Sequence, residues 1–218
     1  MKFYNFIIRY RLILSIIGVI LGLILELFLK SGFWSVFPLY FVALIGIVTE
    51  FIIGPLRLIQ EPMEKGNIEE VEKIIKSIKF PGLLIKPIRS TYYTILGNLS
   101  MMKKDFNTAE KHLRKSSSLG SPLAEAEGAT KLQLGMVAFQ KGNIKEAEQM
   151  MKAALRLGVQ DNESKSLAYL MLCQIYVQKN EFRFAKEQFR KAEACKPKSE
   201  QVLEQIKQIK KYLARVPG

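Results

Sequence analysis

Histidine and cysteine are almost absent from this sequence of 218 residues, which has one histidine and two cysteines. His112 has no acidic or thiol neighbour at a ligand spacing, and Cys173 and Cys195 form no Cys-x-x-Cys pair. A metal site needs several such ligands close together, so the sequence predicts none. It also has no glycine-rich phosphate loop and no nucleophile motif. We therefore expect a protein that is not an enzyme and has no cofactor.

Charge of either sign is scarce in the first 60 residues, which carry five Lys or Arg and two acidic residues. Residues 61–218 carry 28 Lys or Arg against 18 Asp or Glu, a net charge of +10. These cations are spread among glutamates and do not form a stripe with aromatic residues between them, so nucleic-acid binding is not expected. The chain therefore has two regions that suit different solvents.

Two long apolar runs occupy the first region. Residues 12–29 contain 14 Leu, Ile, Val or Phe in 18 positions, which makes about 27 Å of helix, enough to cross a bilayer. A second run, residues 36–53, follows after a short loop. A cleaved signal peptide is the alternative, but no small-residue cleavage site follows Leu29. The runs predict a transmembrane hairpin within residues 1–60.

The cations that flank the runs are distributed unequally. Five cations precede the first run or follow the second, whereas the loop that connects the runs has only Lys30. The five are Lys2, Arg9, Arg11, Arg57 and Lys65. Because cytoplasmic segments carry the excess of cations, we expect an integral protein of the cell or inner membrane with both termini in the cytoplasm. Anionic lipids of the inner leaflet would then attract the basic second region.

Small residues recur along the first run, at Ser15, Gly18 and Gly22. The spacing Gly18-x-x-x-Gly22 is typical of closely packed membrane helices. Ala43 and Gly46 lie at a similar depth in the second run. These residues predict packing within the hairpin, and a homodimer contact through Gly18 and Gly22 is the alternative.

Two acidic residues lie inside the runs. In an antiparallel hairpin they lie near opposite ends, so they cannot share a proton or an ion. We expect Glu26 to lie beside Lys30 at i+4, and Glu50 to pair with Arg9 or Arg11 at the base of the hairpin. A role in transport or proton relay is the alternative, since ionisable groups inside a membrane are often functional.

Residues beyond 60 repeat with a period of 38. The tetrapeptide KGNI stands at 65–68 and 141–144, two periods apart, and predicts a turn in which Gly ends one helix and Asn caps the next. Spacings of three and four between apolar columns predict one buried helical face. The columns are Ile68, Phe106, Ile144 and Phe182; Val71, Ala109, Ala147 and Ala185; and Ile75, Leu113, Met151 and Phe189.

A second register precedes these columns, with Leu96-Gly97, Leu134-Gly135 and Leu172-Cys173, and with Tyr93 and Tyr169 four positions before Gly97 and Cys173. Over about residues 88–198 this pattern resembles the tetratricopeptide repeat (TPR) family, whose antiparallel helix pairs stack into a solenoid. The family period is about 34 residues, so each unit here has about one extra turn, which we place at the start of its first helix.

We therefore expect an all-α chain with two transmembrane helices followed by a TPR-like solenoid and a capping helix. The predicted segments are the hairpin 1–60, a half unit 61–86, units 87–122, 123–160 and 161–198, and the capping helix 199–213 with Ser199 as N-cap. The half unit lacks its first helix. Counting back by 38 places it at 52–65, so we hypothesise that the second membrane helix continues into it.

The resemblance implies a concave groove lined by the first helices. It would contain Thr94, Asn98, Met101, Leu132, Met136, Phe139, Leu170, Gln174 and Val177. An apolar groove with methionine and amide side chains suits an amphipathic helix or an extended apolar peptide, although part of this stripe could instead be core. We expect a membrane-anchored scaffold or adaptor that binds a partner protein. The alternative is an accessory subunit of a membrane transport or secretion complex that acts through the hairpin.

Overall fold

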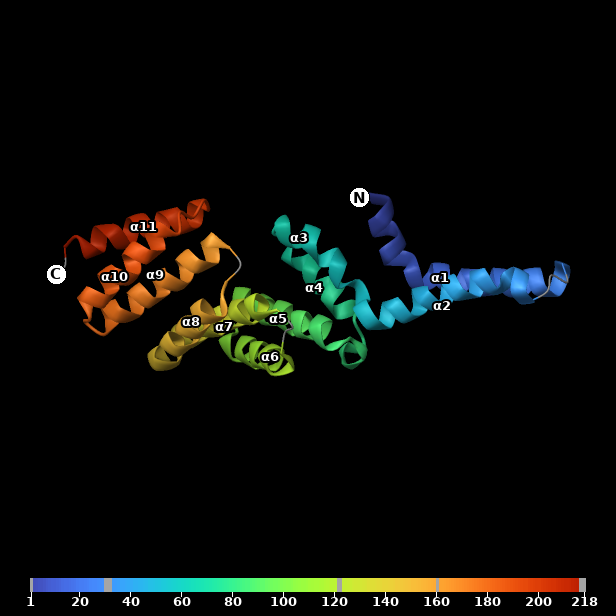
Figure 1. The fold of residues 1–218 in the computed structure, drawn as a ribbon, viewed down its shortest axis with the longest axis horizontal. Coiled ribbons are helices and arrows are strands. Elements are labelled where there is room, and N and C mark those ends of the chain that lie inside the picture. The colour runs from blue at the N-terminus through green and yellow to red at the C-terminus, as the bar shows by residue number, and fades with distance from the viewer. Residues whose placement is uncertain (1, 30–32, 121–122, 160, 216–218) are drawn as a thin grey trace. The chain divides into compact units, whose positions relative to one another are not determined.

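The structure, a computed structural model, describes residues 2–29, 33–120, 123–159 and 161–215. These residues form helices and no strand (Figure 1), so the predicted all-α class is confirmed. The chain divides into two compact units, Met1–Tyr92 and Tyr93–Gly218, at a point inside helix α5 (Lys86–Met102). The boundary expected from composition, near residue 60, lies inside the first unit.

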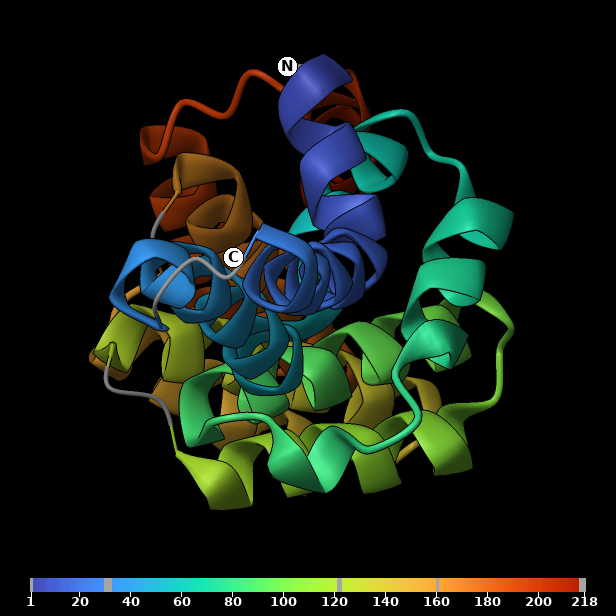
Figure 2. The same cartoon turned by 90° about the vertical axis from the view of Figure 1, so that its right-hand side faces the viewer.

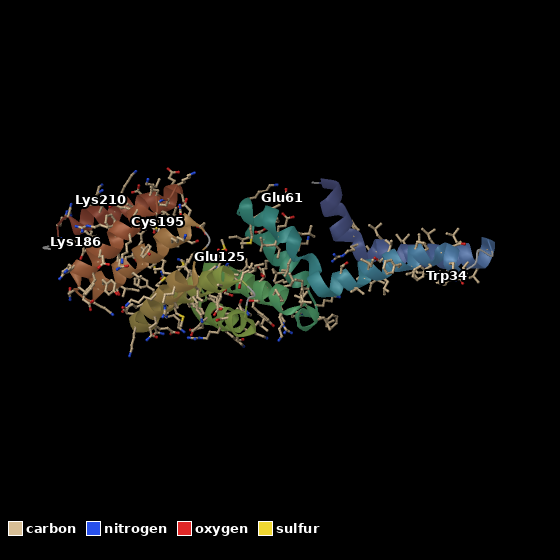
Figure 3. The ribbon with its side chains drawn as sticks, viewed as in Figure 1. Trp34, Glu61, Glu125, Lys186, Cys195 and Lys210 are labelled. Atoms are coloured by element: carbon tan, nitrogen blue, oxygen red, sulfur yellow. The ribbon has the colours of Figure 1, made fainter. Side chains whose placement is uncertain are left out.

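Helices α1 (Lys2–Leu29) and α2 (Phe33–Ile53) run antiparallel and pack against each other. Figure 2 shows them side by side and nearly end-on. Their outward faces are almost purely hydrocarbon (Figure 3), and large side chains such as Leu27, Phe28 and Trp34 are 74%, 82% and 81% exposed. Among the residues that the structure describes, Tyr10–Phe28 is long and apolar enough to cross a membrane, and the described apolar part of α2 is Trp34–Thr49.

The chain then turns back on itself within the first unit. The 3-10 helix η1 (Gly54–Ile59) follows α2 without a break and leads into α3 (Gln60–Glu64). After a turn, α4 (Ile68–Ser77) packs against both η1 and α3. Ile59 and Ile75 are each 2% exposed, so η1 supplies a buried face to α4. A helical segment therefore occupies most of the region where the missing first helix was expected.

The second unit is a stack of helix pairs in strict register. Successive first helices end 38 residues apart, and so do the starts of successive second helices. The first helices are α5, α7 (Ala124–Gln140) and α9 (Asn162–Gln178); the second helices are α6 (Phe106–Leu119), α8 (Ile144–Leu157) and α10 (Phe182–Ala194). Each first helix has 17 residues and each second helix 13 or 14. The extra turn of the long period thus lies in the first helices.

Small residues let the two helices of a pair approach closely. Ala109, Ala147 and Ala185 are all 0% exposed. A Cβ on Gly97 would lie 2.6 Å from Cδ2 of Leu113, and one on Gly128 would collide with the backbone oxygen of Gly158. The predicted columns therefore form the interior of each pair, because only small side chains fit where the backbones meet.

The turns between paired helices repeat as well. Gly66 and Gly142, the glycines of the two KGNI segments, have φ values of +67° and +80°. Lys104 and Asn180 hold the same place in the other turns with φ near +60°. Glycine adopts this left-handed conformation without steric cost, which explains its use here. Asn67 caps α4 through its side chain, whereas Asn143 makes no such bond.

Helix α11 (Glu200–Leu213) covers the end of the stack. Val202, Ile206 and Leu213 are buried against α9 and α10, as predicted for a capping helix. Ser199 occupies the N-cap position, as predicted, but its side chain makes no capping bond. Its backbone N–H donates instead to Oε1 of Glu163 at 3.2 Å.

Adding a methyl group to a glycine at which two paired helices meet tests this packing. Gly128→Ala should lower the free energy of unfolding by about 1–3 kcal/mol, since its Cβ would meet backbone that cannot move aside cheaply. Gly97→Ala should cost less, because the tip of Leu113 can shift. Gly82→Ala, which has open space around it, is the control. Denaturant unfolding followed by circular dichroism measures all three, and equal stabilities would contradict the close approach.

Candidate partner-binding surface

The small residues of the hairpin lie between its two helices. A Cβ on Gly18 would be 3.5 Å from Cβ of Ala43, Gly22 lies against the ring of Tyr40, and Gly46 lies against Ser15. Both glycines of the Gly-x-x-x-Gly motif therefore face α2 of the same chain. The homodimer alternative is not favoured, because the surface it needs is already used within the hairpin.

Glu26 has a partner on the other helix of the hairpin. Tyr40 donates its hydroxyl to Oε2 of Glu26 at 3.1 Å, one helical turn beyond the contact with Gly22. Lys30, the predicted partner, and the side chain of Glu50 lie outside the described residues. The Tyr40–Glu26 bond joins the two helices and gives this acidic group a structural role.

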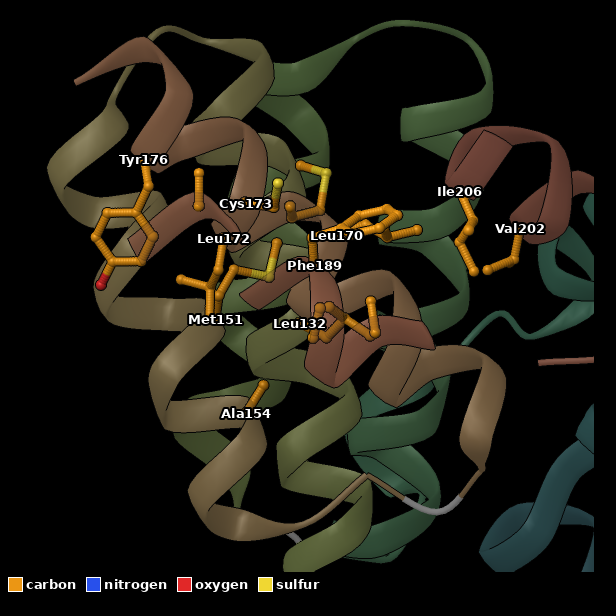
Figure 4. Packing of buried hydrophobic residues seen from close by; sticks show 14 of the residues in the cluster. Leu132, Met151, Ala154, Leu170, Leu172, Cys173, Tyr176, Phe189, Val202 and Ile206 are labelled. Atoms are coloured by element: carbon orange, nitrogen blue, oxygen red, sulfur yellow. The ribbon is translucent and has the colours of Figure 1, made fainter. Parts of the chain in front are cut away.

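The nine predicted groove residues form three columns with a spacing of 38 on α5, α7 and α9. The columns are Thr94, Leu132 and Leu170; Asn98, Met136 and Gln174; and Met101, Phe139 and Val177. Two members of the first column are buried. Leu132 and Leu170 are 5% and 1% exposed inside the main core (Figure 4), and the hydroxyl of Thr94 lies 2.7 Å from that of Ser116. Leu132 and Leu170 therefore belong to the packing of the core, whereas Thr94 is half-buried.

The second and third columns remain at the surface and are half-buried. Met136, Phe139 and Val177 pack against the edge of the main core, and Met101 packs against the cluster of Leu113 and Ala109. Because the two columns are three residues apart on each helix, they form one continuous stripe across the first helices. We call these six residues the groove stripe.

A separate hollow of about 520 Å³ opens between α8, α9 and α10. Its walls include Lys152, Arg156 and Lys191 with the rings of Tyr169 and Tyr176. It shares no residue with the groove stripe.

The remaining nucleophilic and imidazole groups have structural surroundings. The ring of His112 stacks on Tyr93 at 6.1 Å, and burial together with the charges of Lys111 and Lys115 lowers its pKa. Burial raises the pKa of the Cys173 thiol to about 11, so the thiolate that reacts is scarce at neutral pH. These groups therefore belong to the packing of the solenoid.

Comparison with known proteins agrees with this architecture. The model of the tetratricopeptide repeat family matches residues 129–157, which is most of α7 and all of α8. A chain in the crystal structure of the APC/C hetero-tetramer Cut9-Hcn1 superposes with a TM-score of 0.60 at 18% identity. The second unit therefore has the fold of a TPR-like helical solenoid. That match covers 80% of this chain but only 34% of the other, so the chain spans about a third of its length. No curated protein sequence matches significantly.

An ion-pair network connects successive helix pairs. Glu110 pairs with Arg114 on its own helix at 2.7 Å and with Lys141 of the next turn at 2.6 Å. One period later, Glu148 pairs with Lys152 at 2.6 Å and with Lys179. Lys141 is the lysine of the second KGNI, so this tetrapeptide also helps to join units. In the sequence these acidic and basic residues recur 38 positions apart, but the sequence alone did not show that the acidic and basic side chains meet.

Glu148 is the most strongly held of these carboxylates, and its side chain is 15% exposed. Burial opposes its ionisation, but hydrogen bonds from Lys152, Lys179 and Tyr176 outweigh burial and lower the pKa of Glu148 from 4.5 to about 2. A carboxyl group whose pKa is lower in the folded than in the unfolded state stabilises the fold at pH values above its unfolded-state pKa. That contribution is lost as the pH falls from 4.5 toward 2.

Glu148→Gln should lower the free energy of unfolding by about 1–2 kcal/mol at about pH 7, after allowance for solvent screening of the lysines. The difference from the unmodified chain should shrink as the pH falls below 4.5, because protonation removes the same ion pairs. Glu187→Gln, at an exposed pair with Lys191, is the control and should have little effect. Urea unfolding across this pH range measures the effect, and a loss that does not depend on pH would point to packing instead of charge.

Proposed function

We propose that this protein is a membrane-anchored TPR scaffold that holds a partner protein at the cytoplasmic face of the membrane. The observation that carries the proposal is a contrast within one chain. The hairpin exposes large apolar side chains, whose exposure to water is unfavourable. The solenoid instead buries its apolar columns and leaves the groove stripe half-buried. TPR solenoids are interaction folds, and the similar solved chain belongs to a hetero-tetramer.

The exposed apolar surface of the hairpin supports anchoring in a bilayer. Exposed groups cover most of α1 and α2, including Ile20, Phe41 and Val42 at 50%, 50% and 69%. A soluble protein rarely exposes a continuous apolar surface of this extent. Within lipid the same side chains are solvated, and the backbone of both helices is hydrogen-bonded internally. The excess of cations on the terminal side supports a cytoplasmic solenoid.

The groove stripe suits a peptide with apolar side chains on one face. Met136, Phe139 and Val177 offer adaptable apolar contacts, while the amides of Asn98 and Gln174 can bond to a peptide backbone or polar side chains. Half-buried side chains are partly fixed by their own core, which reduces the entropy lost when a partner binds. An amphipathic helix fits this pattern of anchors at i, i+3 and i+4.

Partner capture tests the stripe. Purification from solubilised membranes with Met136→Glu or Gln174→Glu should recover at least about tenfold less of any protein that the unmodified chain retains, because each change buries a charge. Leu203→Glu, on an exposed position of α11, is the control and should retain it. Circular dichroism must show that the variants are folded. Full retention by folded stripe variants, with loss in Glu50→Gln, would favour the accessory-subunit alternative.

The proposed topology gives a separate prediction. A cysteine introduced at Lys207, whose side chain is 72% exposed on α11, should react with a membrane-impermeant maleimide in inside-out vesicles but not in intact cells. Alkaline washing should leave the protein in the membrane pellet. Reaction in intact cells would contradict the orientation, and release by the wash would contradict the anchor.

A further inference from the structure

The segment between α4 and α5 exposes an unusual row of large apolar side chains. Phe80, Leu83 and Ile85 are 65%, 57% and 45% exposed around the short 3-10 helix η2 (Pro81–Leu83). Leu84 between them is 4% exposed and therefore fixes the segment to the protein. The three outward side chains do not contribute to the core of the first unit. An exposed apolar patch of this kind indicates an interaction site. We call residues 78–86 the η2 loop.

The charge around the η2 loop is of one sign. Residues 73–92 contain five Lys or Arg and no acidic residue, and the next acidic residue is Asp105. Lys79 and Lys86 stand at the two ends of the loop and are exposed. Lys76 is neutralised by Glu72 at 2.8 Å. Apolar tips between exposed cations are the pattern of segments that bind the interface of anionic membranes.

The path of the chain brings the η2 loop back toward the end of the hairpin. Beyond α2 the chain runs outward through η1 and α3 and reverses at Lys65–Asn67. It then returns along α4, which packs against η1 (Figure 1). The C-terminal end of α4, and with it the start of the loop, therefore lies at the level of η1. Since η1 directly follows α2, this is the level at which a membrane helix would leave the bilayer.

The loop is held in shape before any contact forms. Nη1 of Arg89 donates to the carbonyl oxygen of Gly82 at 3.1 Å, and Leu84 N–H donates to the carbonyl of Pro81 at 3.3 Å. Pro81 and Pro87 restrict the backbone at both ends of the apolar tips. A preformed loop loses little entropy when it binds.

We propose that the η2 loop is a second membrane contact, in which Phe80, Leu83 and Ile85 enter the headgroup region of an anionic leaflet while Lys79 and Lys86 contact lipid phosphates. This inference rests on the proposed membrane anchoring. The contact would add to the covalent tether of the hairpin and restrict the orientation of the chain at the point where α5 begins.

The test places an environment-sensitive fluorophore on single cysteines in the full chain, with Cys195→Ser and the buried Cys173 retained. The labelled positions are Phe80 and Leu83 in the loop, Leu27 in the hairpin and Leu203 on α11. The protein is reconstituted into vesicles of phosphatidylcholine, with and without phosphatidylserine, that contain a lipid-attached quencher. We expect quenching at positions 80 and 83 with phosphatidylserine, at position 27 in both vesicles, and at position 203 in neither.

The charge of the loop gives a matched pair of variants. Lys79→Gln and Lys86→Gln should each lower the ratio of inserted to free loop about fivefold in phosphatidylserine vesicles. Lys207→Gln on α11 should leave it unchanged. Labels at 80 and 83 that behave like the label at 203, while the label at 27 is quenched, would overturn the loop contact alone. An unquenched label at 27 would instead overturn the membrane anchor.

Discussion

The close approach of two helices at small side chains is the contact on which the rest of this structure depends. In the first two helix pairs of the solenoid, the alanine column and glycines such as Gly97 and Gly128 bring two backbones together, and Leu113 or Met151 then fills the gap between them. Dispersion and the hydrophobic effect both require this fit, because a wider spacing would leave voids. The fixed period of 38 follows, since every unit must present the same face to the next one.

The hairpin uses the same geometry beneath a different surface. Gly18 against Ala43 and Gly46 against Ser15 allow α1 and α2 to pack closely, as Gly97 and Ala109 do in the solenoid. The outward faces differ, because the hairpin exposes leucine, isoleucine and phenylalanine where the solenoid exposes lysine and glutamate. One packing principle thus serves both parts of the chain, and the two parts differ in the polarity of their outward side chains.

Ion pairs reinforce the register of the helix pairs that packing establishes. Glu110 and Glu148 each join a cation of their own helix to a lysine in the next turn, so successive units are held by polar contacts as well as by their cores. The groove stripe lies on the first helices, whereas this network joins the second helices to the turns. A partner could therefore bind the stripe without breaking the ion pairs that stack the units.

The sequence by itself determined the helical class, the period, the buried columns and the positions of the turns, because these depend on spacing along one chain. Only the tertiary structure decided which side chains of the predicted groove are accessible. Leu132 and Leu170 have the same spacing as the accessible columns, but they are buried in the core. It also showed that Tyr40 meets Glu26, that Lys141 reaches Glu110, and that α4 returns the η2 loop to the end of the hairpin. Each of these depends on where segments distant in the sequence meet, and periodicity within a single helix contains no information about that.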